Sequence, residues 1–318
     1  MTAQQNFKQE GSAALLGALE ELSHYVGNTP LYPITRLHNN PRVRIYAKLE
    51  WEQFGGSVKA RPAFNIIWEA VKSGELTQEK RLLDASSGNT GIAYAVFAAA
   101  AGIKLTLCIP ENASKERKHL LKALGAEVIY TSPFEGTDGA QAVAKELHKS
   151  NPELYYYADQ YNNEANWKAH FQGTAKEIWE QTNGSVSHFI AGLGTTGTFT
   201  GTGRGLRELN KDIQLVALQP ESPLHALEGW KHLETAVVPG IFDNQLADKH
   251  QLVSSDEAFE TLRKAALLEG LTLSPSAAAN LTGALALANE LDEGVIVTVL
   301  ADDHSKYTDI IQEYNAER

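Results

Sequence analysis

Short apolar runs alternate with longer amphipathic stretches along almost the whole chain. Several of the short runs are continuously apolar, which is typical of strands covered on both faces. The pattern predicts strands at Val43–Leu49, Leu82–Ala85, Lys104–Ile109, Glu127–Tyr130, His188–Leu193, Ile213–Gln219 and Val295–Leu300. Between them a helical period predicts helices near Lys59–Ser73, Thr90–Ala101, Lys115–Leu124, Gly136–Lys149, Asn166–Thr182, Gly197–Leu209, Asp256–Glu269 and Ser276–Asn289. This alternation indicates an α/β fold, with parallel sheets that carry helices on both sides.

The chain shows no internal repeat and no low-complexity linker. A polar break at Asn151-Pro152 is a candidate domain crossing. The segment Pro220–Lys249 is less regular and rich in Pro and Gly, so we expect a long loop that frames a site.

Length and charge limit the function classes. With 318 residues, 43% hydrophobic and 21% charged, the chain can form one large globular domain or two ordinary ones. Its formal net charge is −11 and no basic block stands out, so we expect no nucleic-acid partner. The longest uncharged apolar stretch, Gly91–Ile103, is too short to span a bilayer, so we expect no membrane association.

The single cysteine and the first residues predict the compartment. Cys108 lies in an apolar run and is expected to be a buried strand residue; a lone cysteine allows no intrachain disulfide and favours a reducing compartment. The polar start Met1–Asn6 lacks an apolar signal segment. We therefore expect a cytoplasmic protein.

Lys59 is the first candidate for chemistry. It follows the turn Gly55-Gly56-Ser57 and leads directly into an apolar helical pattern. Burial lowers the pKa of a lysine, and a neutral amine is a nucleophile that can form a Schiff base. The structural alternative is a solvated lysine in a first helical turn.

The junction Asp84–Gly91 clusters hydroxyls, an amide and backbone N–H groups between a strand and an alanine-rich helix. A helix N-terminus of this kind binds an anion such as a carboxylate. Helix capping with turn glycines is the alternative, although Ser86, Ser87, Asn89 and Thr90 together exceed what capping needs.

The junction Gly192–Thr198 follows an apolar strand and opens a helix. Its glycines allow close approach and its threonines add hydroxyl donors, which is typical of a phosphate site. The same residues match G-x-G-x-x-G, and Glu221 lies near the end of the next strand, so an NAD-dependent oxidoreductase remains an alternative. That alternative explains neither Lys59 nor the Asp84–Gly91 junction.

A third junction, Leu273–Ala279, places Ser276 at the start of an alanine-rich helix. Ser276 is either a helix cap or a lone hydroxyl donor. A lysine for an aldehyde, a phosphate loop, a carboxylate loop and a hydroxyl donor together suit pyridoxal phosphate and an amino-acid substrate. We expect no metal.

The combined motifs resemble those of a known family. They are Gly27-Asn28-Thr29-Pro30-Leu31, Gly55-Gly56-Ser57-Val58-Lys59, Ser87-Gly88-Asn89-Thr90-Gly91 and Gly194-Thr195-Thr196-Gly197-Thr198. Their order and spacing are similar to those of the cysteine synthases, or O-acetylserine sulfhydrylases, which are fold-type II pyridoxal-phosphate enzymes. The resemblance runs from about Tyr25 to Tyr307. Gln219-Pro220-Glu221 and Pro239–Phe242 look most like the B form, cysteine synthase B.

This resemblance implies two three-layer αβα domains with mostly parallel sheets, similar to the tryptophan synthase β subunit. The smaller, mobile domain would comprise residues 47–157 and carry the substrate carboxylate loop. Residues 11–46 and 158–318 would form the larger domain, which binds the cofactor phosphate. The implied function is a β-replacement that forms L-cysteine from O-acetyl-L-serine and sulfide, in a homodimer. The same fold with another nucleophile, as in cystathionine β-synthases or diaminopropionate-forming synthases, remains an alternative.

The resemblance also implies roles for individual residues. Lys59 would bind the cofactor covalently and act as the catalytic base, and Ser276 would face the pyridine nitrogen. Asn89 would contact the cofactor's phenolic oxygen. The cofactor phosphate would be held by Gly194, Thr195, Thr196, Gly197 and Thr198. The substrate carboxylate would be held by Ser86, Ser87, Gly88, Asn89, Thr90 and Gln160.

The chain departs from the family pattern at several positions. Ala60 stands where the family usually has Asp, and Ala301 stands where the B form has a cysteine. Glu228 lies where the B form carries an arginine, which opposes the use of thiosulfate or a phosphorylated serine. The segment Ala301–Tyr307 replaces the usual Asp-x-Gly-x-x-Tyr pattern.

Overall fold

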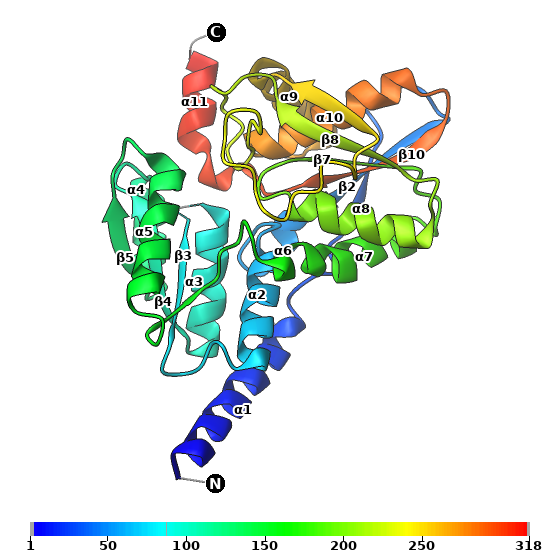
Figure 1. The fold of residues 1–318 in the computed structure, drawn as a ribbon. Helices are drawn as coiled ribbons and strands as arrows, with labels where there is room; N and C mark the ends of the chain where they lie inside the picture. Colours follow the sequence, from blue (N-terminus) through cyan, green and yellow to red (C-terminus); the bar gives the residue numbers. More distant parts are fainter. Residues whose placement is uncertain (1–2, 87, 317–318) are drawn as a thin grey trace. The chain divides into compact units, whose positions relative to one another are not determined.

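A computed structural model describes residues 3–86 and 88–316 (Figure 1). The chain divides into two compact units. Unit 1 comprises Met1–Val26 with Lys59–Asn166, and unit 2 comprises Gly27–Val58 with Trp167–Arg318. The sequence-based division set the crossings at residues 47 and 158, whereas the units change over at Lys59 and Trp167, and residues 11–26 group with unit 1. The mobility of the smaller domain stays a prediction.

Unit 1 is built on a four-stranded sheet with strand order β5-β4-β3-β6. All its strand pairs are parallel. The strands are β3 (Arg81–Ala85), β4 (Lys104–Pro110), β5 (Glu127–Thr131) and β6 (Tyr155–Tyr157). The helices are α1 (Ala3–Ser23), α2 (Ala60–Ser73), α3 (Asn89–Ala101), α4 (Lys115–Ala123), α5 (Gly136–Ser150) and the start of α6 (Glu164–Ala169).

Alternation along these strands separates two apolar layers in unit 1. Leu82, Leu105 and Leu107 pack with α2, α3 and α4, whereas Leu83 and Cys108 pack with α5. Cys108 is fully buried, as predicted, and burial raises the pKa of its thiol to about 12.

Unit 2 is built on a six-stranded sheet with strand order β1-β2-β10-β7-β8-β9. Only the β1–β2 pair is antiparallel among the pairings of its named strands. The strands are β1 (Leu31–Ile34), β2 (Val43–Leu49), β7 (His188–Gly192), β8 (Gln214–Pro220), β9 (Lys249–Val253) and β10 (Gly294–Leu300). The α-helices are α7 (Ala175–Gln181), α8 (Gly197–Leu209), α9 (Ser255–Glu269), α10 (Pro275–Glu290) and α11 (Thr308–Ala316). Shorter helical turns are η1 (Glu50–Glu52), η2 (His170–Thr174) and η3 (His304–Lys306).

The sheet of unit 2 also separates two layers. Residues of α9, α10 and α11 pack on one face, and residues of α7 and α8 pack on the other. Both units are therefore mostly parallel sheets between helices, and the predicted α/β fold is confirmed.

Several elements differ from the sequence-based prediction. The helix predicted over Asn166–Thr182 is interrupted by a π-helical turn, His170–Thr174. Strands β1, β6 and β9 were not predicted. All three lie at sheet edges, and they are too short or too polar to give a strand pattern. The segment between β8 and β9 is irregular, as expected for a long loop.

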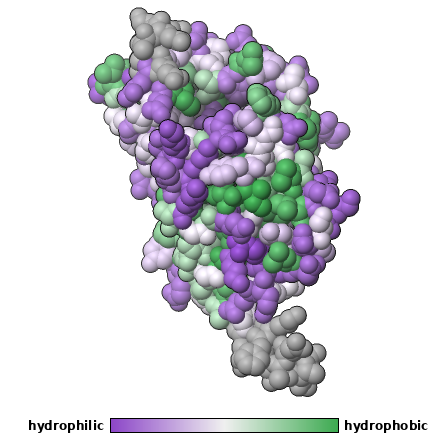
Figure 2. Space-filling model, turned by 90° about the vertical axis from the view of Figure 1, so that its left-hand side faces the viewer, coloured by the Kyte–Doolittle hydropathy of each residue, from purple (hydrophilic) through white to green (hydrophobic). Residues whose placement is uncertain are grey.

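Hydrophilic side chains cover much of the surface in the view of Figure 2, and a connected apolar area lies near the middle of that view. Phe134 and Leu224 are the most exposed large apolar side chains of the described residues, at 97% and 93%. Single exposed apolar residues are ordinary on a protein surface. In residues 3–86 and 88–316, no helix is both long enough and apolar enough to cross a membrane.

Candidate active site

The junction between β3 and α3 in unit 1 is a tight turn organised by Ser86. The Ser86 hydroxyl oxygen accepts hydrogen bonds from the backbone N–H groups of Gly88, at 3.3 Å, and Gly91, at 3.2 Å. A Cβ atom at Gly91 would lie 2.2 Å from the Ser86 carbonyl oxygen, so only glycine fits there. Ser87 lies outside the described residues.

Thr90 and Gln160 are far apart in sequence but in direct contact within unit 1. The Thr90 hydroxyl donates to the Gln160 side-chain oxygen at 2.7 Å, and both side chains are buried. Gln160 Nε2 donates to the carbonyl oxygen of Ala85 at 3.5 Å, and Asn166 Nδ2 donates to the Gln160 carbonyl oxygen at 2.7 Å. Asn89 is the first residue of α3 and is half-buried. The structure thus brings Ser86, Thr90 and Gln160 together at the carboxyl ends of strands β3 and β6 of unit 1.

Asp84 is a buried acid beside this turn that the sequence reasoning did not single out. It is 1% exposed, and burial raises the pKa of its carboxyl to about 7, with the nearby charge of Asp159 adding to the shift. A polar residue in the otherwise apolar run Leu82–Ala85 was the available signal.

Lys59 is the residue at which the chain passes from unit 2 into unit 1. Its side chain is half-buried, and its carbonyl oxygen accepts the N–H of Ala63 at 3.0 Å, which starts α2. The preceding loop belongs to unit 2, where Val58 N–H donates to the Ala301 carbonyl at 2.8 Å and the Lys306 ammonium donates to the Gly56 carbonyl at 2.9 Å. The backbone next to Lys59 is therefore fixed by the segment that follows β10.

The loop from Gly192 to Thr198 lies in unit 2, between β7 and the N-terminus of α8. Its glycines are required sterically. A Cβ atom at Gly192 would lie 2.0 Å from the Trp230 ring, and one at Gly194 would lie 2.0 Å from the Gly229 carbonyl oxygen. The loop is thus packed against the segment 229–231, and Lys231 N–H donates to the Leu193 carbonyl at 2.8 Å.

Thr196 gives the test of whether this loop suits a phosphate. It has φ 69°, a rare conformation for a β-branched residue, and it directly precedes α8. Its buried hydroxyl oxygen has no hydrogen-bond partner among the residues that the structure describes. A strained threonine with an unsatisfied hydroxyl at a helix N-terminus fits an anionic ligand, so the loop suits the phosphate of a cofactor.

Thr198, the second residue of α8, is supported by the π-helical turn. His170 Nε2 lies 3.2 Å from the Thr198 hydroxyl, and His170 Nδ1 lies 2.9 Å from the Thr174 hydroxyl. His170 is 1% exposed. The sequence reasoning missed His170, because a lone histidine in a helical stretch gives no pattern of its own.

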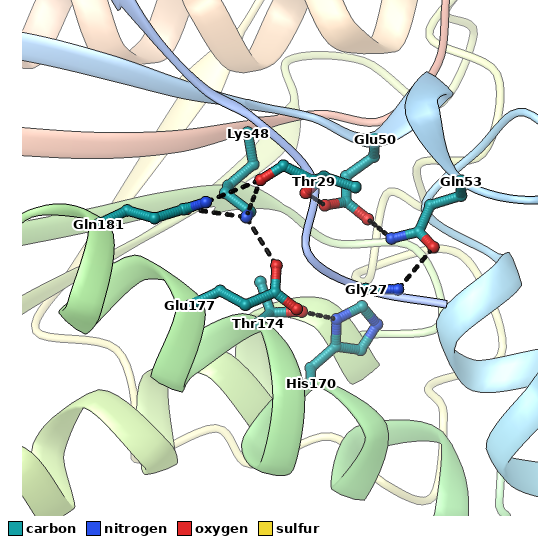
Figure 3. A network of polar contacts seen from close by, with 9 residues as sticks. All are labelled: Gly27, Thr29, Lys48, Glu50, Gln53, His170, Thr174, Glu177 and Gln181. Atoms are coloured by element: carbon teal, nitrogen blue, oxygen red, sulfur yellow. Dashed lines mark hydrogen bonds and ion pairs between the residues drawn. The ribbon is translucent and has the colours of Figure 1, made fainter. Parts of the chain in front are cut away.

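A second polar network surrounds the buried Lys48 (Figure 3). The Lys48 ammonium is fully buried and contacts Glu177 and the Thr29 carbonyl oxygen at 2.7 Å each, and Gln181 at 2.9 Å. The Thr29 hydroxyl donates to Glu50 at 2.7 Å. This network fixes the Gly27–Leu31 motif against β2 and α7, which gives that motif a structural role.

Ser276 is the second residue of α10 and is 5% exposed. The helix cap is Ser274, whose side chain accepts the N–H of Ala277 at 3.1 Å. Ser276 therefore is not the cap, and its hydroxyl lies 3.3 Å from that of Ser274. This removes the capping alternative and leaves the hydroxyl available for a ligand.

Comparisons with known proteins identify the class. Residues 22–302 match the family model "Pyridoxal-phosphate dependent enzyme". The chain belongs to this family, so it is an enzyme of the pyridoxal-phosphate class with the fold-type II architecture.

Named relatives narrow the family further. The chain is 46% identical over 297 residues to a cysteine synthase of Aquifex aeolicus, with 91% of each chain covered. It is 37% identical over 289 residues to cysteine synthase B of Escherichia coli, with 91% of this chain and 94% of the relative covered. A crystal structure of cysteine synthase from Entamoeba histolytica superimposes with a TM-score of 0.86 at 30% identity, covering 91% of this chain and 88% of that one. The predicted resemblance to the cysteine synthases is confirmed, and the NAD-dependent alternative is not favoured.

The structure explains one departure from the family pattern. Ala60 is fully buried in the apolar core of unit 1, where a carboxylate would need a partner to offset its loss of hydration. Glu228 is half-buried, and its N–H donates to the Ala226 carbonyl at 3.0 Å. Nothing in the structure explains why an acid stands at this position.

Proposed function

We propose that this enzyme forms L-cysteine from O-acetyl-L-serine and sulfide by a β-replacement reaction. The single observation that carries the proposal is the 46% identity to a cysteine synthase over almost the whole chain. Pyridoxal phosphate, when bound, supplies an electron sink that acidifies the Cα–H bond of an amino acid.

Unit 2 supplies the groups proposed to hold the cofactor phosphate. Gly194, Thr195, Gly197 and Thr198 offer backbone and hydroxyl donors at the N-terminus of α8, and Thr196 adds a buried hydroxyl that needs a partner. The positive end of the helix dipole favours the phosphate charge. Ser276 offers a neutral hydroxyl for the pyridine nitrogen. A neutral hydroxyl does not stabilise a protonated pyridine ring as a carboxylate does. The ring is then a weaker electron sink, which favours prompt loss of the β leaving group over a long-lived carbanion.

Unit 1 supplies the groups proposed to bind the substrate. The N-terminus of α3, with Gly88 as its cap, presents backbone N–H groups to a carboxylate. Ser86, Ser87 and Gln160 add side-chain donors, Thr90 orients the Gln160 amide through its own hydroxyl, and Asn89 is assigned to the cofactor's phenolic oxygen. Exclusion of water from the bound substrate would limit hydrolysis to pyruvate.

Lys59 is proposed to hold the cofactor and to act as the base. Its amine removes the Cα proton of the bound amino acid, and acetate leaves from Cβ. Sulfide then adds at Cβ, and Lys59 returns the proton to Cα. Because acetate leaves before sulfide adds, the kinetic mechanism is ping-pong. Acetate leaves with the electron pair of the Cβ–O bond, and no oxidant is required.

The proposal includes a homodimer that works in the cytoplasm on small-molecule substrates. The lone, fully buried Cys108 supports a reducing compartment. Light scattering coupled to size exclusion tests the dimer; a mass of one chain would contradict it.

The activity test measures cysteine formation from O-acetylserine and sulfide, together with the visible absorbance of the purified protein. We expect turnover and a visible band in the parent. The Lys59→Ala variant should lose the band of the lysine-bound cofactor and about three orders of magnitude in turnover or more, because base and covalent anchor are removed together. Lys72→Ala, an exposed lysine of the same helix, is the matched control and should keep both. A parent without turnover on O-acetylserine, but active with another sulfur or amine nucleophile, would assign the same chemistry to a different product.

A further inference from the structure

Asp84 lies beneath the turn that is proposed to bind the substrate carboxylate. It is the last residue but one of β3 and is 1% exposed. Since strand side chains alternate, it shares the α3 face of the sheet with Leu82, which belongs to the apolar core of unit 1. A carboxyl group in such a core is stable as an anion only with a compensating partner.

Hydrogen bonds connect Asp84 to the proposed substrate groups. Its Oδ1 accepts the N–H of Ala85 at 2.8 Å, and the Gln160 backbone N–H lies close enough to lower the pKa of the carboxyl. Ala85 in turn accepts Gln160 Nε2 at 3.5 Å, and Gln160 accepts the Thr90 hydroxyl at 2.7 Å. The carboxyl of Asp84 therefore touches both chain segments that carry the donors for an anionic ligand.

The titratable groups described as interacting with Asp84 are phenols, a thiol and an acid. Tyr94 of α3, Cys108 of β4, Tyr156 and Tyr157 of β6, and Tyr161 all interact with it electrostatically. Burial raises the pKa of each of these phenols and of the thiol, so they are neutral at physiological pH. The charged group among those that shift the pKa of Asp84 is Asp159, which is acidic.

Tyr94 is the neighbour that distinguishes this site from an ordinary core. It is fully buried, and its hydroxyl lies near enough to Asp84 that each group shifts the pKa of the other. Neither the Tyr94 hydroxyl nor Asp84 Oδ2 has a hydrogen-bond partner of ordinary geometry within the described part of the chain. A proton on Asp84 Oδ2 would neutralise the carboxyl and give it a donor for this otherwise unsatisfied site.

We propose that Asp84 is a positioning residue whose neutral form holds Ser86, Thr90 and Gln160 ready for the substrate carboxylate, and whose ionised form opposes binding of that carboxylate. This inference rests on the proposed function, because it takes the anion at the turn to be the substrate. An anion at the turn disfavours a second negative charge on Asp84, so substrate binding retains or takes up a proton. By reciprocity, ionisation of Asp84 weakens substrate binding by the same factor.

The test compares the pH profile of KM for O-acetylserine in the parent holoenzyme and in Asp84→Asn. The asparagine keeps the shape but cannot ionise. From about pH 6 to about pH 9, the parent KM relative to that of the variant should rise on the order of ten-fold, with its midpoint near pH 7, because one pKa unit of coupling is a factor of ten. Asp212→Asn, an exposed aspartate of unit 2, is the matched control and should follow the parent at every pH. Parallel parent and Asp84→Asn profiles would overturn the proposal.

The Tyr94→Phe variant provides a second test, because a purely structural role of Asp84 would not predict a change in the pH profile of KM when the Tyr94 hydroxyl is removed. The Tyr94 hydroxyl lowers the pKa of Asp84. Removing this hydroxyl should therefore shift the midpoint of the KM rise to higher pH. Difference infrared spectra, independent of turnover, should show a protonated carboxyl band in the parent at about pH 6 that is absent from Asp84→Asn. If the parent does not use O-acetylserine, the proposed function fails, whereas the infrared band still decides the protonation of Asp84. A missing band, or an unchanged midpoint in Tyr94→Phe, counts against Asp84 alone.

Discussion

The Thr198 hydroxyl lies 3.2 Å from His170 Nε2, and the other ring nitrogen of His170 lies 2.9 Å from the Thr174 hydroxyl. The π-helical turn His170–Thr174 places this ring between the two threonines. His170 thereby fixes the orientation of a hydroxyl that is proposed to bind the cofactor phosphate, without itself being assigned to the phosphate.

We expect His170→Phe to weaken cofactor binding by about ten-fold, because the half-buried Thr198 hydroxyl loses the partner that orients it. Thr198→Val should have a similar effect, and the double variant should lose little more, since both changes remove one interaction. Equilibrium dialysis of the apo protein against pyridoxal phosphate measures the affinity. His250→Phe, an exposed histidine of unit 2, is the control. Additive losses in the double variant would show that His170 acts independently of Thr198.

Substitution of Lys48 should strongly lower the stability of unit 2. Its ammonium is fully buried, and it bonds to Glu177, Gln181 and the Thr29 carbonyl. Lys48→Met removes the buried ammonium that pairs with the largely buried Glu177 carboxylate, at an expected cost of about 3 kcal/mol in the free energy of unfolding. Lys264→Met, which breaks an exposed pair with Glu260, should change it by about 0.5 kcal/mol or less. Urea titration measures both, and equal effects would contradict the role of burial.

The sequence predicted the fold well where the pattern reports burial. Apolar runs such as Lys104–Ile109 correspond to strands that are covered on both faces. The observed strand β4 is one residue longer than this predicted run and ends at Pro110. The edge strand β9, Lys249–Val253, was missed because it is polar and half-exposed. The π-helical turn was missed because its residues keep a helical pattern, and only the contacts of His170 show the interruption.

The candidate site was predictable as far as its loops carry glycines and hydroxyls. The glycines at 91 and 194 stand where a Cβ atom would collide with a carbonyl oxygen, so a local steric demand is readable in sequence. Asp84 and Tyr94 were missed, because their role depends on a side-chain proximity across β3 and α3. Ser274 and Ser276 could not be told apart as caps until the hydrogen bond from Ala277 was known.

The buried carboxyl of Asp84 also predicts how stability depends on pH. Its pKa is about 7 in the folded chain and about 3.9 when unfolded, so the folded state binds more protons between these values. The contribution of Asp84 to the free energy of unfolding is therefore largest below about pH 4, and it falls as pH rises to about 7, by at most about 1.4 kcal/mol per pH unit.

Asp84→Asn should remove this dependence. Relative to the parent, the variant should gain stability between about pH 4 and about pH 7 and show no further relative change above that. Urea midpoints at several pH values measure the difference, with Asp212→Asn as the control. A relative gain that appears only below pH 4 would have the wrong sign for a raised pKa.

Glu228 is expected to limit the use of bulky anionic substrates, namely thiosulfate as sulfur donor and O-phosphoserine as amino-acid substrate. A carboxylate near an incoming anion is unfavourable at short range, whereas an arginine is favourable and can bind it with two hydrogen bonds. We therefore expect Glu228→Arg to raise kcat/KM for thiosulfate and O-phosphoserine far more than for sulfide. Glu221→Arg, an exposed acid of the same long loop, is the control. Equal changes for all three substrates, or efficient use of thiosulfate by the parent, would contradict this role.

Ser274 and Ser276 form a matched pair that separates helix capping from cofactor contact. Ser274→Ala removes the cap of α10 and should lower the free energy of unfolding by about 1 kcal/mol while leaving the visible spectrum unchanged.

Ser276→Ala leaves the cap intact and should instead lower turnover by about five-fold, the equivalent of one neutral hydrogen bond of about 1 kcal/mol. Ser276→Asp places a carboxylate where the pyridine nitrogen is proposed to lie, so it should favour a protonated ring, change the visible spectrum and increase the share of pyruvate. Spectra, product ratios and urea midpoints of the three variants decide the assignment. If Ser276→Asp kept the parent spectrum and product ratio, the hydroxyl of Ser276 would have no contact with the ring.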